Sequence, residues 1–187
     1  ANPFRGFVDE AGDALGVDFC LNVTHGPAGI TGVAAGDPRQ VVESLAETAK
    51  DALSVSVTEE YDAVVAGIGA PKDANLYQAS RAPTYVALGA NNPLRDDGRL
   101  IVPAGLSEGA GEGRGEQRFY ETLSTAESAT ALYNELRSGY EPGTQRAFVL
   151  TRVLRDHNVW VTNSECPDII TDCLMSASER LEDAIEP

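Results

Sequence analysis

Positively charged residues are scarce in this 187-residue sequence. Fourteen basic residues, only two of them Lys, stand against twenty-nine acidic ones, so the net charge is −15. Such an acidic surface repels nucleic-acid phosphates and anionic lipid headgroups, and we therefore expect neither a nucleic acid nor a membrane as a partner. The hydrophobic content of 42% argues against a disordered chain. Few Lys and many acidic side chains are instead typical of proteins adapted to high salt.

Long apolar runs, cysteine clusters and paired histidines are also missing. The sequence has no apolar stretch of transmembrane length and no signal-like segment at its N-terminus, so we expect a cytoplasmic protein. Cys20, Cys166 and Cys173 are odd in number and far apart, which excludes a disulfide framework and a CxxC metal site. His25 and His157 stand alone in sequence. We therefore expect no metal site in this chain.

The first third of the sequence predicts a helix, a hairpin and a second helix. Apolar spacing indicates helices, and the turn Gly26-Pro27-Ala28-Gly29 separates two strand-like runs. Asp37-Pro38 has the composition of a helix start. The chain begins at Ala1 without Met, close to a helical pattern, and we expect a fragment of a longer protein. The ranges are helix 3–15, strands 19–24 and 30–34, and helix 38–53.

The remaining sequence alternates between strands and helices, a pattern typical of parallel pairing. It predicts an α/β fold, a parallel, Rossmann-like three-layer sheet domain at 58–187, preceded by the helix–hairpin–helix segment at 1–57. That segment would pack on a missing N-terminal domain. A turn at Asp96-Asp97-Gly98 leads into the second strand. The predicted strands are 63–68, 99–103 and 159–162, and the predicted helices are 74–90, 116–137, 144–156 and 176–185.

The stretch GAPKDANLYQASRA at 69–82 follows the first of these strands. In an open parallel sheet, ligands bind where the carboxyl ends of the strands lead into helices. The Gly-rich stretch 105–115 has the same place after the second strand, so two loops share one edge. The letters GIGAPK at 67–72, which overlap the start of this stretch, lack the GKS or GKT ending of a P-loop. Lys72 stands where a dinucleotide fingerprint needs its third Gly. We expect no nucleotide-binding loop here.

Tyr77, Gln78 and Arg81 bring together a phenol, a carboxamide and a guanidinium, which suit a carboxylate or phosphate ligand. The spacing equally fits a purely structural interpretation. In it, Asn75 caps the helix and the Gln78 side chain reaches back to the cap in a capping box, while a solvated Arg81 pairs with a surface acid. On spacing alone both interpretations stand. Pro83 predicts a kink or restart of the helix just after Arg81.

Two charged loop residues are further candidates. Lys72 is flanked by Pro71 and Asp73, and we expect an exposed cation near an anionic ligand rather than a catalytic amine. Glu108, which follows the second strand, is either a polar group of the site or a loop acid.

Several segments together resemble one family. GIGAPKDANLYQASRA resembles the stretch Gly-Gly-x-Pro-x-Asp-x-Asn-x-Tyr-Gln-x-x-Lys of the nickel-pincer lactate racemases. DDGRLIVPAGLSEGAG, VDFCLNVTHGPAGITGVAAGDP and GTQRAFVLTRVL are similar to further segments of the same family. In the last of them, Gln145 and Arg146 replace the family's His and Lys. The resemblance covers nearly the whole chain and corresponds to the C-terminal part of such an enzyme.

The resemblance implies a role as the C-terminal domain that closes over substrate and cofactor in a 2-hydroxy-acid, lactate-like racemase or epimerase. It implies substrate- or cofactor-binding roles for Tyr77, Gln78 and Arg81, to which the position in the loops adds Lys72 and Glu108. The nickel pincer nucleotide, the catalytic His pair and the attaching Lys belong to the N-terminal domain of family enzymes. We therefore expect no catalytic residue and no cofactor in this fragment, which would be inactive alone.

The same resemblance implies two partners, a small 2-hydroxy acid and the chain's own N-terminal domain. Arg81 stands where the family has Lys, which replaces a point charge by a planar fork. Together with the acidic composition, the resemblance points to an enzyme of a halophilic archaeon. Two alternatives stand beside it, a non-catalytic small-anion binding module on a Rossmann-like sheet and a scaffold domain without a ligand.

Overall fold

The chain divides into two compact units. The computed structural model describes residues 3–26 and 28–185. The first unit comprises Ala1–Ser56 and the second Val57–Pro187. Within the described residues, no helix is both long and apolar enough to span a membrane.

The first unit is the predicted helix, hairpin and helix. Helix α1 (Pro3–Leu15) precedes the strands β1 (Cys20–Gly26) and β2 (Gly29–Gly36), which pair antiparallel, and α2 (Pro38–Leu53) follows. Asp37 caps α2 because its Oδ1 accepts hydrogen bonds from the backbone N–H groups of Arg39 and Gln40, at 3.0 and 3.1 Å. Helix α2 packs on the hairpin with its buried Val41 and Leu45.

Many apolar side chains of the first unit are exposed. The buried part of the unit is small, with no buried residue in α1. Exposed apolar area of this extent is typical of protein–protein interaction surfaces. The side chains are Phe7, Leu15, Phe19, Leu21, Ile30 and Val33.

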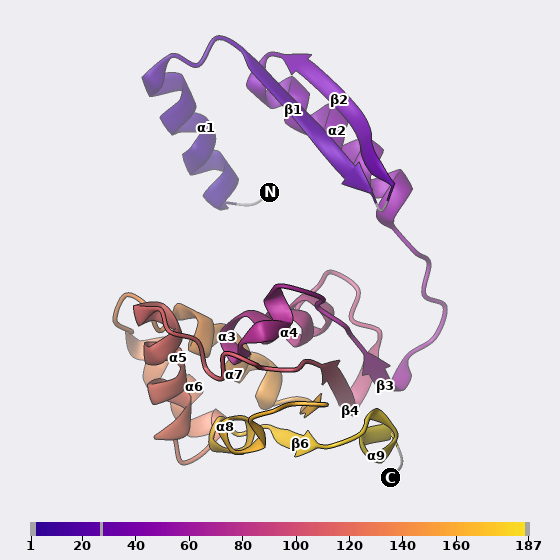
Figure 1. The fold of residues 1–187 in the computed structure, drawn as a ribbon. Coiled ribbons are helices and arrows are strands. Elements are labelled where there is room, and N and C mark those ends of the chain that lie inside the picture. The colour runs from indigo at the N-terminus through magenta and orange to yellow at the C-terminus, as the bar shows by residue number, and fades with distance from the viewer. Residues whose placement is uncertain (1–2, 27, 186–187) are drawn as a thin grey trace. The chain divides into compact units, whose positions relative to one another are not determined.

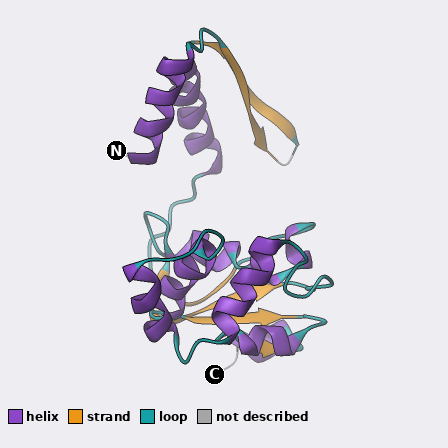
Figure 2. Ribbon diagram, turned by 90° about the vertical axis from the view of Figure 1, so that its left-hand side faces the viewer, coloured by secondary structure: helices purple, strands orange, loops and turns teal. Residues whose placement is uncertain are grey.

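The second unit is built on a parallel four-stranded sheet, which confirms the predicted α/β fold. The strands run in the order β3-β4-β5-β6, and each neighbouring pair is parallel. Figure 2 shows the strands in orange among the purple helices. The strands are β3 (Tyr61–Val65), β4 (Leu94–Pro103), β5 (Asn158–Thr162) and β6 (Ser176–Ser178).

Helices cover this sheet on both faces. Successive side chains of a strand point to opposite faces. In β4, Leu100 and Val102 belong to the main core, together with side chains of helices α3 to α8. Ile101 points to the other face and is fully buried, and α9 (Leu181–Ile185) contacts β4, β5 and β6. The elements of the main face are the 3-10 helix η1 (Lys72–Ala74) and the helices α3 (Leu76–Ala79), α4 (Arg81–Ala87), α5 (Arg114–Ser124), α6 (Ala129–Ser138), α7 (Gln145–Leu154) and α8 (Pro167–Asp172), several of which Figure 1 labels.

The predicted helix 74–90 is three short pieces, η1, α3 and α4. The break falls at Ser80, one residue before the expected position after Arg81. Pro83 lies in the first turn of α4, where backbone N–H groups have no helical partner, so the absence of an N–H from Pro83 costs no hydrogen bond there.

Two other helix predictions were also wrong in part. The stretch 116–137 contains two helices, because Ser128 starts α6 by accepting a hydrogen bond from the N–H of Ala131. The stretch 176–185 begins with strand β6, whose Ser176, Ala177 and Ser178 pair with β5, and only then forms α9. Pairing with a neighbouring strand overrides the weak helical preference of so short a segment. Helix α8 was not predicted.

The strand predictions need smaller corrections. The first strand ends at Val65, three residues before the predicted end, and lies at the sheet edge, so it is not fully buried. The expected turn 96–98 is part of β4 and forms an irregularity there, with Asp97 at φ 59°.

Candidate functional site

Two loops meet at the carboxyl edge of the sheet, where the sequence predicted a site. The loop after β3 and the loop after β4 are joined by backbone hydrogen bonds. Leu106 N–H donates to the Asp73 carbonyl at 2.9 Å, and Glu108 N–H donates to the Ala74 carbonyl at 2.7 Å. Leu76 N–H in turn donates to the Gly109 carbonyl at 2.9 Å. The stretch 105–109 therefore forms a wall beside 73–76.

Asn75 holds these loops and the start of α3 together. Its Oδ1 accepts a hydrogen bond from Gln78 N–H at 3.0 Å, which caps α3. Its Nδ2 donates to Glu108 Oε2 at 3.1 Å and to Glu116 Oε1 at 3.5 Å. The side chain of Asn75 is buried, so its donors and acceptors need these partners. The sequence identified the cap but not the two carboxylates that complete it.

Glu108 lies where the sequence placed it, at the loop edge, and it is exposed. One of its carboxylate oxygens is engaged by Asn75. Glu116, at the start of α5, accepts a hydrogen bond from Gly113 N–H at 2.8 Å and lies against Gly111. A side chain at position 111 would overlap Glu116, and the φ of 103° there suits glycine.

Gln78 and Arg81 contact each other directly. Arg81 Nε donates to Gln78 Oε1 at 2.8 Å, and Arg81 Nη1 donates to the Tyr85 hydroxyl at 3.3 Å. Gln78 therefore does not reach back to complete a capping box. Among the described residues, no acidic side chain forms an ion pair with Arg81. Gln78 keeps its amide hydrogens, and Arg81 keeps Nη2, for a further partner.

Tyr77 is half-buried, like Gln78 and Arg81. Its ring packs edge-on against Phe119, with centroids 5.5 Å apart. The guanidinium of Arg146 lies 6.0 Å from the centre of the Tyr77 ring. Tyr77 belongs to α3 and Arg81 to α4, with the break at Ser80 between them.

Arg146 was not predicted as a site residue. It lies in the first turn of α7, and its Nη1 donates to Thr84 Oγ1 at 3.1 Å. The helices α4 and α7 are in contact. The sequence signal was the match of GTQRAF to a family segment, in which Arg146 replaces a Lys, but spacing alone could not place it next to Tyr77 and Thr84.

Positive charge is concentrated at Tyr85. The hydrogen bond from Arg81 lowers the pKa of the Tyr85 phenol, and the charges of Arg81, Arg146 and Lys72 lower it further. Lys72 is exposed, as the sequence predicted. Three of the fourteen basic residues of a chain with a net charge of −15 thus act on one hydroxyl. Such an arrangement attracts anions.

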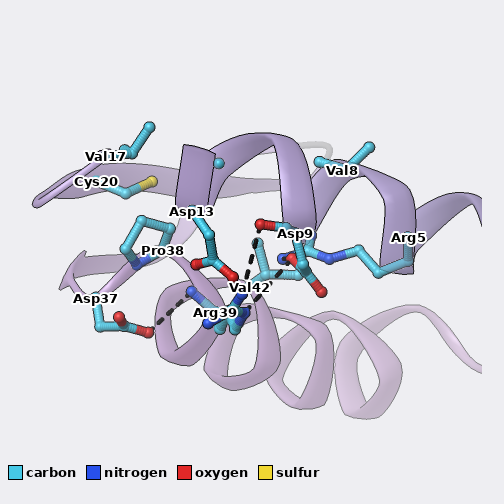
Figure 3. A pocket seen from close by; sticks show the side chains of 11 residues that line it. Arg5, Val8, Asp9, Asp13, Val17, Cys20, Asp37, Pro38, Arg39 and Val42 are labelled. Carbon is cyan, nitrogen blue, oxygen red and sulfur yellow. Dashed lines mark hydrogen bonds and ion pairs between the residues drawn. The ribbon is translucent and has the colours of Figure 1, made fainter. Parts of the chain in front are cut away.

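The first unit contains a pocket of a different character, with a volume of about 240 Å³ (Figure 3). Its cations are already paired with carboxylates. Arg5 contacts Asp9 at 2.8 Å, and Arg39 contacts Asp13 at 2.5 Å and Asp9 at 3.9 Å. Both arginines of the lining are thus paired, and its acids Asp9, Asp13 and Asp37 outnumber them, so the pocket offers no unpaired cation to an anionic ligand.

No group of three or more His, Cys, Asp and Glu side chains in the described part of the chain could hold a metal ion. Of the three cysteines, Cys173 is buried, and desolvation raises the pKa of its thiol to about 12. The described residues therefore do not fit a nickel site by themselves.

Comparisons with known proteins give one consistent result. A lactate racemase of Lactiplantibacillus plantarum is 28% identical over 162 residues, which are 84% of this chain and 36% of that protein. The structure of the lactate racemase apoprotein from Thermoanaerobacterium thermosaccharolyticum has the same fold, with a TM-score of 0.79 at 22% identity. That match covers 94% of this chain and 42% of the other, so this chain spans less than half of either relative. Residues 57–187 match the family described as the lactate racemase C-terminal domain. The chain belongs to this family.

Proposed function

We propose that this chain is the C-terminal part of a 2-hydroxy-acid racemase or epimerase and that it closes over the bound substrate and cofactor. The observation that carries the proposal is the state of Arg81. Its guanidinium is held by two neutral groups, Gln78 and Tyr85, and no carboxylate of the described residues neutralises it. The family match supports the choice of a 2-hydroxy acid as the substrate class.

In this proposal, Arg81 and Gln78 bind an oxyanion. A guanidinium fixed on one edge presents its remaining N–H groups in a planar fork that fits a carboxylate or phosphate. The free amide hydrogens of Gln78 point to the same use, and Lys72 adds positive charge. Tyr77 forms a wall of the site through its ring. Glu108 supports the site by holding Asn75.

The catalytic groups and the nickel pincer nucleotide would come from the chain's own N-terminal domain in the full-length parent. Two observations support this division. The described residues contain no metal-binding cluster, and the first unit exposes apolar side chains such as Phe7 and Phe19. The curated relative is also much longer than this chain.

The substitution Arg81→Ala in the full-length parent tests the proposal. It removes a charge-assisted contact worth about 1.5–3 kcal/mol, so racemisation should fall by about one to two orders of magnitude. The melting temperature should hardly change, because a partly exposed Arg adds little stability. Arg137→Ala, at an exposed position on α6, is the matched control. Full racemisation activity together with a lower melting temperature for Arg81→Ala would remove this residue from the site.

A further inference from the structure

Two half-buried arginines, Arg81 and Arg146, have no carboxylate partner among the described residues. Among the described residues, Arg5, Arg81, Arg99 and Arg146 are half-buried. Arg5 pairs with Asp9, and Arg99 donates to a backbone carbonyl and lies 5.9 Å from the Trp160 ring. Arg81 and Arg146 also contact neutral groups, namely hydroxyl, amide and aromatic side chains, and no carboxylate of the described residues pairs with them. In a chain with twenty-nine acidic residues, this absence needs a reason.

The two arginines approach the same short segment from different helices. Arg81 begins α4 and bonds to Tyr85 one turn later. Arg146 comes from α7 and bonds to Thr84, the residue before Tyr85. Thr84 is buried, and its hydroxyl also donates toward the carbonyls of Ser80 and Arg81, at 3.2 and 3.0 Å. The guanidinium of Arg146 is therefore anchored, through the Thr84 hydroxyl, to the helix that carries Arg81.

Tyr85 adds a donor to this pair. It is 60% exposed, and its oxygen accepts the hydrogen bond from Arg81, so its own O–H is left to donate to solvent or to a ligand. Arg146 and Lys72 act on the same hydroxyl electrostatically, although they make no hydrogen bond with it. The cations thus converge on the side of α4 that Tyr85 exposes.

We propose that Arg146 and Tyr85 extend the Arg81 site to bind a molecule that carries two negative charges. One arginine is enough for a single carboxylate, whereas two half-buried arginines without carboxylate partners match a doubly charged oxyanion. The second charge comes either from a second carboxylate, which makes the substrate a 2-hydroxydicarboxylic acid, or from a phosphate group. The inference rests on the proposed function for the position of the ligand. It adds Arg146 as the residue that selects a doubly charged ligand.

Binding to the 187-residue chain, without a histidine tag, tests the inference. The probes are inorganic phosphate, malate and lactate, titrated at constant ionic strength, with the amide and Arg Nε–H signals followed by NMR. Phosphate or malate should shift the signals of Arg81, Arg146, Thr84 and Tyr85 in a saturable way, and lactate should bind about tenfold more weakly. Tighter binding of malate than of phosphate assigns the second charge to the substrate, and the reverse order assigns it to a phosphate group.

The substitution Arg146→Gln should weaken binding of the dianion about tenfold and leave lactate binding nearly unchanged. Arg152→Gln, at an exposed position on the same helix, is the matched control and should bind like the parent chain. Unchanged signals of distant residues confirm that each variant is folded. Three results would overturn the inference: dianion binding that survives Arg146→Gln, equal affinity for lactate and malate, or no saturable shift with any probe.

The binding experiments test this inference separately from the proposed function, because they require no catalytic turnover. If both arginines bind a dianion but Arg81→Ala in the full-length parent racemises normally, the dianion site stands and the proposed function fails. If Arg81→Ala loses activity but Arg146→Gln binds dianions normally, the proposed function stands and this inference fails.

Discussion

At the scale of single residues, the site depends on which partner each polar side chain finds. Arg81 has acids available throughout the chain but bonds to Gln78 and Tyr85. The alternative of a capping box with an acid-paired Arg81 is therefore not realised, because Gln78 completes no capping box and Arg81 forms no ion pair among the described residues. Neutral partners fix the direction of the guanidinium and leave its charge uncompensated, which is the state that an anion-binding residue needs.

The pKa of Tyr85 reports this contact. The hydrogen bond from Arg81 and, to a lesser extent, its positive charge stabilise the phenolate, so the pKa of Tyr85 lies below its ordinary value. Arg81→Ala should raise the pKa of Tyr85 toward the value of a free phenol, about 10. A ¹³C NMR titration of the Tyr85 ring measures it, with Arg152→Ala as the control. An unchanged pKa in Arg81→Ala would show that the hydrogen bond does not persist in solution.

At the scale of elements, Asn75 connects η1, α3, α5 and the loop after β4. One buried carboxamide caps α3 and bonds to two carboxylates, Glu108 and Glu116. Asn75 and Glu116, 41 positions apart in the sequence, thereby connect the start of α3 to α5. The short helices α3 and α4 depend on such contacts, because helices of one or two turns are not stable by themselves.

Asn75→Ala should therefore destabilise the second unit. It removes the cap and leaves Gln78 N–H without its acceptor, at a cost of about 1–3 kcal/mol. The fluorescence of Trp160, the single tryptophan, reports unfolding of this unit in urea. Asn134→Ala, at an exposed position on α6, is the matched control. If both variants unfold at the same urea concentration as the parent chain, the capping role assigned to Asn75 is wrong.

At the scale of the whole molecule, the charge of −15 is the dominant feature. The ion pairs among the described residues are few and largely exposed, so they compensate little of it. Against this background, three cations, Arg81, Arg146 and Lys72, act on the Tyr85 hydroxyl. Repulsion among the carboxylates disfavours the folded state and is weakened by salt.

The melting temperature should consequently rise between low and molar potassium chloride. For a chain of this size, each kcal/mol of added stability raises it by about 2–4 °C. Replacing the exposed Glu43, Glu47 and Glu135 by Gln should reduce the salt dependence, because fewer repulsive charges remain to be screened. A melting temperature that is constant or lower at high salt would contradict adaptation to high salt.

The sequence by itself determined the fold class, the main strands and the edge of the sheet at which polar residues gather. Alternating apolar runs and turn residues act locally, so they predicted the helix–hairpin–helix segment, the three long strands and the Asn75 cap. Only the tertiary structure decided the rest. Strand β6 exists because β5 offers it a partner, and the helix predicted at 74–90 is interrupted at Ser80. Arg146 bonds to Thr84, which is 62 positions away in the sequence. The packing of α7 against α4 creates this contact, and no local sequence pattern encodes it.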